Sequence, residues 1–145
     1  MIGLLQRVSE ASVVVDGITV GRIGRGLMVL VAVHRDDTEQ DVKRLAERIL
    51  GYRVFPDEEG RMNRSVEDEA GGLLLVPQFT LAADTKKGTR ASFTKAADPA
   101  MGQDFFERLV DICRSRLESV ETGRFGAHME VRLVNDGPVT FWLQT

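Results

Sequence analysis

Cysteine is almost missing from this chain, which has a single one, Cys113, among 145 residues. An internal disulfide is therefore impossible, and a reducing, intracellular compartment is expected. Long apolar runs are missing too, since no window approaches the ~20 apolar residues that a membrane-spanning helix needs. Residues 1–8 place Arg7 after the apolar stretch, which is not the order of a signal peptide. We therefore expect a cytoplasmic protein.

The chain also lacks an excess of positive charge. Lys and Arg total 19 and Asp and Glu total 22, which gives a formal net charge of −3. Binding duplex nucleic acid without regard to its sequence needs a broad basic face. The composition argues against such a face, but it is compatible with a local basic patch that holds one end of an RNA.

The common catalytic motifs are absent as well. The chain has no G-x-S-x-G elbow, no Walker A loop and no G-x-G-x-x-G loop. His34 and His128 have no partners at a recognisable metal-ligand spacing, so neither a metal nor a cofactor is expected. Cys113 falls on the apolar face of a predicted helix, which favours a buried core thiol over a nucleophile.

What the chain does contain is the composition of one globular domain over residues 1–145, with 43% hydrophobic and 28% charged residues. Apolar and alternating runs predict strands at 4–8, 13–15, 18–20, 27–33, 73–77, 129–134 and 139–143. Asp16-Gly17 predicts a two-residue type I′ turn between the second and third of these. Residues 135–138 predict another turn, between the last two strands.

Helical spacing of apolar residues predicts two helices. The first follows Thr38, with Asp41 completing a capping box, and ends near Gly51. The second begins with Asp98 as the N-cap and Pro99 as the first helical residue. This order predicts a mixed α/β, sheet-rich α+β fold, with layered β-sheets covered by two helices. Two helices are few for so much sheet, so we expect a dimer to cover an exposed edge or face.

Residues 73–81 are the clearest candidate for part of a functional site. They begin as a run of branched apolar residues typical of a buried strand. Pro77 lacks a backbone donor and so ends that strand. Gln78 and Thr80 then place polar side chains on either side of Phe79. A buried strand that ends in this way predicts one wall of an active site.

Residues 137–140, Gly-Pro-Val-Thr, are the candidate for the opposite wall. Gly137-Pro138 has two open interpretations. It can be a turn before an edge strand, or it can be a cis peptide, which is rare outside X-Pro bonds. In the cis form, neighbouring carbonyl oxygens face the same side and can accept hydrogen bonds from a ligand amine.

A basic loop follows the first wall. Residues 85–97 carry Lys86, Lys87, Arg90 and Lys95 and no acid. The loop is either simply solvated or it binds phosphate, and the sequence favours neither interpretation. If it lies near residues 77–80, it would hold a short stretch of nucleic acid or a phosphorylated ligand.

A series of ordered segments makes the chain resemble the D-aminoacyl-tRNA deacylase family over essentially its full length. The matching segments are residues 6–8, 15–17, 55–63, 77–81, 87–93, 121–127 and 135–140. The resemblance implies the fold of that family and a homodimeric enzyme that hydrolyses the ester between a D-amino acid and the terminal adenosine of tRNA. It implies a role in proofreading for translation, and glycine mischarged on tRNA(Ala) is expected to be a further substrate.

The resemblance also implies roles for particular residues. Gln78, Phe79 and Thr80 would be catalytic, and Pro77 would contact the substrate. In the family the Gly-Pro bond is cis and is inserted into the partner's site, where Gly137 and Pro138 here would capture the substrate amine and exclude an L side chain. Phe125 and Met129 would line the adenosine pocket. Lys86, Lys87 and Arg90 are the candidates for tRNA binding.

The chain departs from the family pattern in two places. Pro77 stands where the family has serine, so no serine hydroxyl can be required there. Ala91 stands where the family often has proline. Two other functions remain open: a non-catalytic RNA-binding dimer that uses the basic loop, and a hydrolase for some other small activated ester.

Overall fold

The computed structural model describes residues 1–145, and most of its elements follow the periodicities of the sequence. The strands of the main sheet are β1 (Ile2–Val15), β2 (Ile18–Ile23), β3 (Gly26–Ala32), β6 (Gly72–Pro77), β7 (Val120–Thr122) and β8 (Glu130–Gln144). A separate small hairpin consists of β4 (Phe55–Pro56) and β5 (Met62–Arg64). The helices are α1 (Glu39–Gly51), α2 (Pro99–Arg114) and a short 3₁₀ turn, η1 (Phe79–Ala82). Neither long helix combines the length and the apolar character needed to cross a membrane.

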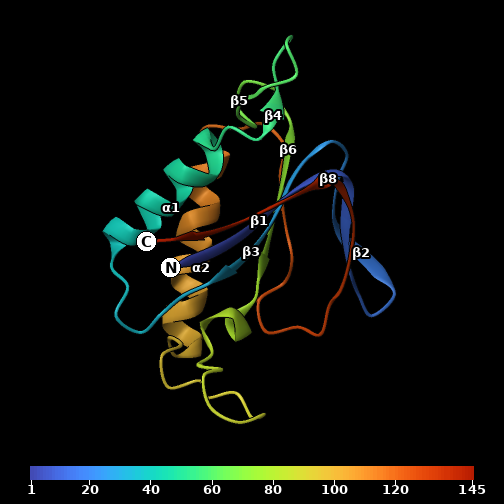
Figure 1. Ribbon diagram of the computed structural model, residues 1–145. Coiled ribbons are helices and arrows are strands. Elements are labelled where there is room, and N and C mark those ends of the chain that lie inside the picture. The colour runs from blue at the N-terminus through green and yellow to red at the C-terminus, as the bar shows by residue number, and fades with distance from the viewer.

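Strand β1 organises the six-stranded sheet. Its first half, Ile2 to Val8, pairs with β3, and its second half, Ala11 to Val15, pairs with β2. Strand β8 runs along the other side of β1 over almost its whole length. Beyond β3 the order continues to β6 and β7, both in parallel. Because the two halves of β1 have different neighbours, the sheet curls, and the β1–β2 hairpin turns away from the helices (Figure 1).

The two faces of the sheet bury two separate cores. Leu73 and Leu75 of β6 belong to a cluster of 23 buried residues that includes the apolar sides of α1 and α2. Leu74 and Val76, on the opposite face, belong to a smaller cluster inside the curl of β1, β2 and β8. Both helices therefore cover one face, while the sheet covers its other face itself (Figure 1). The predicted mixed, sheet-rich fold with two helices is confirmed.

Local signals in the sequence placed several elements correctly. Asp16 and Gly17 have φ angles of 50° and 76°, as a type I′ turn requires. Asp41 accepts hydrogen bonds from the backbone N–H and the hydroxyl of Thr38, which hold its pKa below the usual value. Asp98 Oδ1 accepts the Met101 N–H at 2.9 Å, so α2 begins where the sequence predicted.

Other expectations were wrong. Residues 135–138 do not separate two strands, because β8 is continuous from Glu130 to Gln144. Its pairing with β1 shifts between the partners of Gln6 and Val8, so residues 136–139 bulge out without partners. Such a bulge tolerates a proline in an edge strand, since no ladder donor is needed there. The two-residue strand β4 was not predicted, and β7 was missed because it has only three residues.

The parallel pair β3–β6 begins at a very close contact. Gly26 is paired with Gly72, and a Cβ on Gly26 would lie 1.9 Å from the Gly72 carbonyl oxygen. This contact sets the register that ends with Val31 beside Pro77. The absence of a side chain at Gly26 is therefore a requirement of the sheet.

Gly26→Ala is expected to lower the free energy of unfolding by about 3 kcal/mol, at the upper end of overpacking costs, because backbone would have to move. Urea unfolding followed by circular dichroism measures this loss. Gly24→Ala is the control, since a Cβ at Gly24 meets no atom within 4 Å. Equal unfolding midpoints for the two variants would contradict the explanation.

Candidate active site

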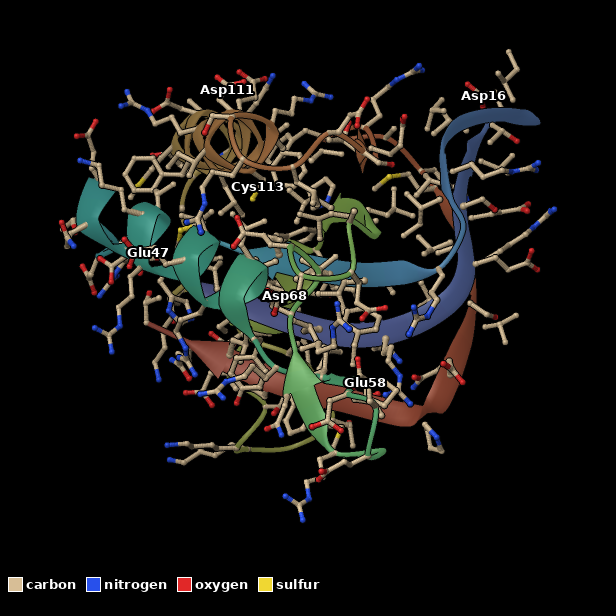
Figure 2. The ribbon with its side chains drawn as sticks, turned by 90° about the horizontal axis from the view of Figure 1, so that it is seen from above. Asp16, Glu47, Glu58, Asp68, Asp111 and Cys113 are labelled. Carbon is tan, nitrogen blue, oxygen red and sulfur yellow. The ribbon has the colours of Figure 1, made fainter.

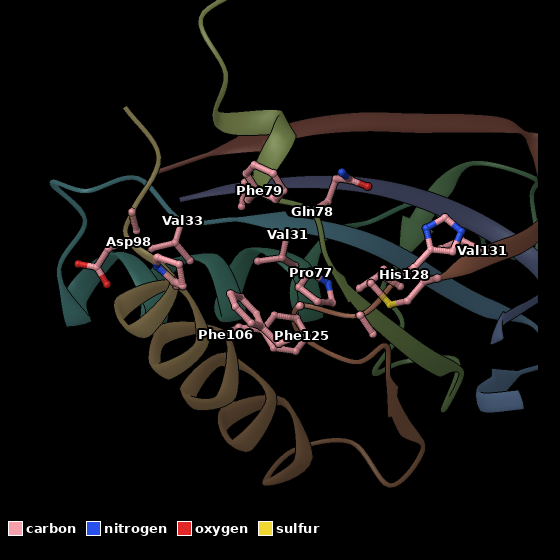
Figure 3. A pocket seen from close by; sticks show the side chains of 18 residues that line it. Val31, Val33, Pro77, Gln78, Phe79, Asp98, Phe106, Phe125, His128 and Val131 are labelled. Atoms are coloured by element: carbon pink, nitrogen blue, oxygen red, sulfur yellow. The ribbon is translucent and has the colours of Figure 1, made fainter. Parts of the chain in front are cut away.

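A cavity of about 440 Å³ lies where β3 and β6 end side by side. Val31 of β3 is in register with Pro77 of β6, and both residues line the cavity. The first turns of α2 and the loop of residues 125–129 supply the other walls. Eleven of the eighteen lining residues are hydrophobic (Figure 3). A largely apolar hollow with a few polar groups is the usual form of a small-molecule site.

Pro77 determines how the chain leaves the sheet. The next residue, Gln78, donates its backbone N–H to the Val31 carbonyl at 2.7 Å, and the chain then turns into η1. The backbone N–H groups of Phe79 and Thr80 donate to no acceptor of the chain. The Gln78 side-chain amide donates to the Thr80 hydroxyl. Residues 78–80 thus present two free backbone donors and a hydrogen-bonded amide–hydroxyl pair beside the cavity.

Glycines allow the aromatic wall to form. A Cβ on Gly102 of α2 would lie only 3.3 Å from Cζ of Phe125, so the bare helix surface accommodates that ring. A Cβ on Gly123 would lie 2.8 Å from the Met129 sulfur, which shows how closely this loop packs. The Gly123 N–H donates to the Leu75 carbonyl at 2.8 Å and so attaches the loop to β6. Phe106 and Phe125 lie next to each other on the α2 side of the cavity (Figure 3).

The cavity contains few groups that can act as acids, bases or nucleophiles. Its ionisable lining side chains are Asp98 and His128, and Asp98 caps α2. Cys113 lies beneath α2 on the side that faces the sheet (Figure 2) and is fully buried, as predicted for a core thiol. Burial raises the pKa of its thiol to about 12, which keeps it protonated at neutral pH. His128 is therefore the one ionisable side chain of the lining that has no role in capping a helix.

The basic loop adjoins the cavity through an aromatic contact. The rings of Phe79 and Phe93 have centroids 5.1 Å apart. Asp84 and Ser92 exchange two backbone hydrogen bonds, of 2.8 and 3.0 Å, and so close the base of the loop. The Lys86 N–H, donating to the Asp84 carboxylate, holds the pKa of that group below its usual value.

The cations of this loop are exposed at its tip. Lys86, Lys87 and Arg90 line no part of the cavity. They lie outside the cavity, beyond Phe79, on the segment whose base is closed by the Asp84–Ser92 hydrogen bonds.

The Gly137-Pro138 peptide is cis, and it lies in the exposed bulge of β8. It does not line the cavity of its own chain. Arg7 holds the bulge in place, since its Nε donates to the Asp136 carbonyl at 3.0 Å and its Nη1 to the Val54 carbonyl at 2.7 Å. The Asn135 side chain accepts the Val139 N–H at 3.1 Å and donates to the Thr140 hydroxyl at 2.8 Å, which closes the bulge from within.

The structure thus brings together some of the predicted site residues and not others. Those that line one cavity are Pro77, Gln78, Phe79, Phe125 and Met129. Thr80 is attached to them through Gln78, whereas the Gly137-Pro138 pair and the basic tip lie elsewhere in the chain. The sequence missed Val31, Phe106 and His128 as lining residues. For Val31 a signal existed, because the carboxyl ends of parallel strands meet at one edge of a sheet.

Arg7→Ala is expected to lower the free energy of unfolding by roughly 3 kcal/mol, because it removes hydrogen bonds from a charged donor to two carbonyls. The Arg7 side chain is only 14% exposed, so water replaces these bonds poorly. Denaturant unfolding measures the loss. The control is Arg22→Ala, which removes an exposed arginine without an ion pair and should cost less than about 0.5 kcal/mol. A similar loss in both variants would refute the anchoring role of Arg7.

Comparison with known proteins supports the resemblance found in the sequence. Residues 4–144 match the family described as D-Tyr-tRNA(Tyr) deacylase. A D-aminoacyl-tRNA deacylase of Alkalilimnicola ehrlichii is 66% identical over 99% of this chain and 96% of its own length. Among solved structures, a c-Myc DNA unwinding element binding protein is 37% identical and has a TM-score of 0.95, with coverage of 100% of this chain and 99% of that one.

A second solved structure shares the fold at lower identity. A probable eukaryotic D-amino acid tRNA deacylase is 20% identical and has a TM-score of 0.86, with coverage of 99% of this chain and 98% of that one. On the family match and the level of identity to its relatives, the chain belongs to the D-Tyr-tRNA(Tyr) deacylase family.

Proposed function

We propose that this chain hydrolyses the ester bond of D-aminoacyl-tRNA in the cytoplasm, releasing the D-amino acid and the tRNA. The observation that carries the proposal is the cavity at the end of β6, where Pro77, Gln78 and Phe79 meet Phe125 and Met129. The relatives that are 60–66% identical over 99% of the chain are named D-aminoacyl-tRNA deacylases, and their activity is a hydrolase activity. An aromatic and apolar cavity of this size suits a terminal adenosine carrying an amino acid.

The proposed chemistry needs no protein nucleophile, because an aminoacyl ester is already activated. A water molecule attacks the ester carbonyl carbon. The vicinal 2′-hydroxyl of the ribose orients this water and relays its proton, accepting it while passing the hydroxyl's own proton to the departing ribose oxygen. The free N–H groups of Phe79 and Thr80 stabilise the oxyanion that forms. The carbon–oxygen bond to the ribose then breaks, and the ribose oxygen leaves with a proton. Gln78 and Thr80 position the reacting groups.

Selectivity is proposed to come from a second copy of the chain. Strand β8 pairs only with β1, so its outer edge is open over 15 residues. Val134 and Trp142 on this strand are each 50% exposed. Long apolar edges usually pair or are covered, which supports a homodimer.

In that dimer the exposed Gly137-Pro138 bulge would enter the partner's cavity. Carbonyl oxygens beside Pro138 would accept hydrogen bonds from the substrate amine, and the bulge would leave no space for an L side chain. This mechanism rejects the wrong substrate by steric exclusion and does not require recognition of a D side chain. Arg7 and Asn135 would keep the bulge in position.

The basic loop is proposed to contact the tRNA. Its exposed cations lie beyond Phe79, where they can contact phosphates of a tRNA whose charged end occupies the cavity. Contacts of this type with phosphates position a nucleic acid without reading its sequence. Lys86, Lys87 and Arg90 are the proposed contacts.

Incubation with D-tyrosyl-tRNA, L-tyrosyl-tRNA and glycyl-tRNA tests the function. The D ester and the glycyl ester should be hydrolysed and the L ester should persist, because only an L side chain meets the bulge. Acid-gel analysis of charged tRNA follows each reaction. No turnover of the D ester at micromolar enzyme would leave the non-catalytic RNA-binding dimer as the better explanation. Survival of glycyl-tRNA at enzyme levels that strip D-tyrosyl-tRNA would contradict the exclusion mechanism.

The same assay with D-tyrosyl-adenosine addresses the remaining alternative, a hydrolase for small activated esters. That alternative requires D-tyrosyl-adenosine, which lacks the tRNA body, to be hydrolysed as fast as D-tyrosyl-tRNA.

Thr80→Ala is expected to reduce kcat by about tenfold and not to abolish turnover, since one orienting hydrogen bond is worth about 1.4 kcal/mol and the oxyanion donors are backbone groups. Single-turnover kinetics with D-tyrosyl-tRNA measure the rate, and filter binding measures tRNA affinity. Thr80→Ser, which keeps the hydroxyl, should restore most of the rate. Complete loss of turnover in Thr80→Ala with unchanged tRNA binding would instead indicate a direct chemical role for the hydroxyl.

A further inference from the structure

A second hollow lies on the other side of the aromatic wall. It has a volume of about 290 Å³ and is lined by the exposed side of α2 and by residues 122–125. Phe106 and Phe125 line both this hollow and the first cavity. A ligand that extends from the first cavity past Phe125 would therefore enter the second one.

The polar side chains of this hollow differ from those of the first cavity. Gln103 donates to Glu107 at 2.8 Å, so both side chains are engaged. Asp111, Arg114 and Arg124 also line the hollow, and none of them has an ion-pair partner in the chain. Asp111 points away from the core on the outer side of α2 (Figure 2). Unpaired charges of both signs therefore face one small hollow that has an aromatic wall.

We propose that this hollow binds the cytosine that precedes the terminal adenosine of the tRNA acceptor end, an inference that rests on the proposed function. The occupant of the first cavity is then the adenosine, with its base against Phe125 and Met129. All tRNA acceptor ends read C-C-A, so the adjoining nucleotide is a cytidine. Its base reaches the opposite side of the Phe106–Phe125 wall, where an aromatic surface favours stacking.

The unpaired side chains match the hydrogen-bonding edge of cytosine. A carboxylate accepts a hydrogen bond from the exocyclic N4 amino group of cytosine, and we assign this contact to Asp111. A guanidinium donates hydrogen bonds to the ring nitrogen and the carbonyl oxygen of cytosine, and we assign these contacts to Arg114. Uracil reverses two of these groups, since it presents an oxygen to Asp111 and an N–H to Arg114. The site thus discriminates cytosine from uracil.

Arg124 is assigned to the phosphate between the two nucleosides. Its backbone N–H lies 3.3 Å from the Met129 sulfur of the first cavity, while its side chain lines the second hollow. It therefore stands at the junction between the two sites. A guanidinium in this place neutralises the bridging phosphate and holds the acceptor end in register.

Competition by dinucleotides tests the proposal. CpA, UpA and adenosine 5′-monophosphate are each added to the hydrolysis of D-tyrosyl-tRNA, and their inhibition constants are compared. The inhibition constant of CpA should be about tenfold lower than that of UpA, from one set of base-edge contacts. Arg114→Ala should make the inhibition constants of CpA and UpA similar. It should leave the inhibition constant of adenosine 5′-monophosphate unchanged. Arg44→Ala, which removes an exposed arginine without an ion pair on α1, is the matched control and should preserve the tenfold difference.

Equal inhibition by CpA and UpA would overturn the proposal, as would no inhibition by CpA at millimolar concentration. A preference for CpA that survives Arg114→Ala would overturn the assignment to this hollow. Calorimetric titration of the same dinucleotides requires no turnover. A protein that binds CpA tenfold more tightly than UpA but fails to hydrolyse D-tyrosyl-tRNA would refute the proposed function while supporting the cytosine site.

Discussion

The parallel contact between β3 and β6 is the constraint on which the rest of the structure depends. At one end, Gly26 and Gly72 approach so closely that no side chain fits at Gly26. At the other end, Val31 and Pro77 finish side by side and open the candidate active site. Between them, alternate residues of β6 enter the two separate cores. Register, burial and the place of the site are thus set by one pair of strands.

The chemistry of the site follows from the same strand end. Since Pro77 stops the ladder, the next residues turn into η1 with two backbone donors unused. Backbone donors are fixed by the fold and need no particular side chain, so the proposed role of the Phe79 and Thr80 N–H groups is compatible with proline at position 77. The side chains around the cavity then mainly determine its shape. Gly102 and Gly123 allow the close approach of the Phe125 ring and the Met129 side chain, which form part of the cavity wall.

Features that depend on short stretches of sequence were predictable. The Asp16-Gly17 turn, the caps at Thr38 and Asp98 and the strand end at Pro77 each arise from the preferences of a few adjacent residues. The continuity of β8 was not predictable, because the bulge at residues 136–139 is accommodated by Arg7 and its neighbours on β1, far away in the sequence. The contribution of α2 to the cavity was missed for the same reason. Only the folded chain brings Gly102 beneath the Phe125 ring.

The aromatic contact between Phe79 and Phe93 has a thermodynamic consequence. One residue, Phe79, both carries a free backbone donor at the cavity and holds the basic loop by its ring. A ligand that shifts the loop can therefore also shift that donor, and a ligand bound at the donor can act on the loop. Coupling of this kind is reciprocal and equal in both directions. In the proposed function, the affinity for the body of a tRNA and the affinity for its charged end would thus be linked through the contact between these two rings.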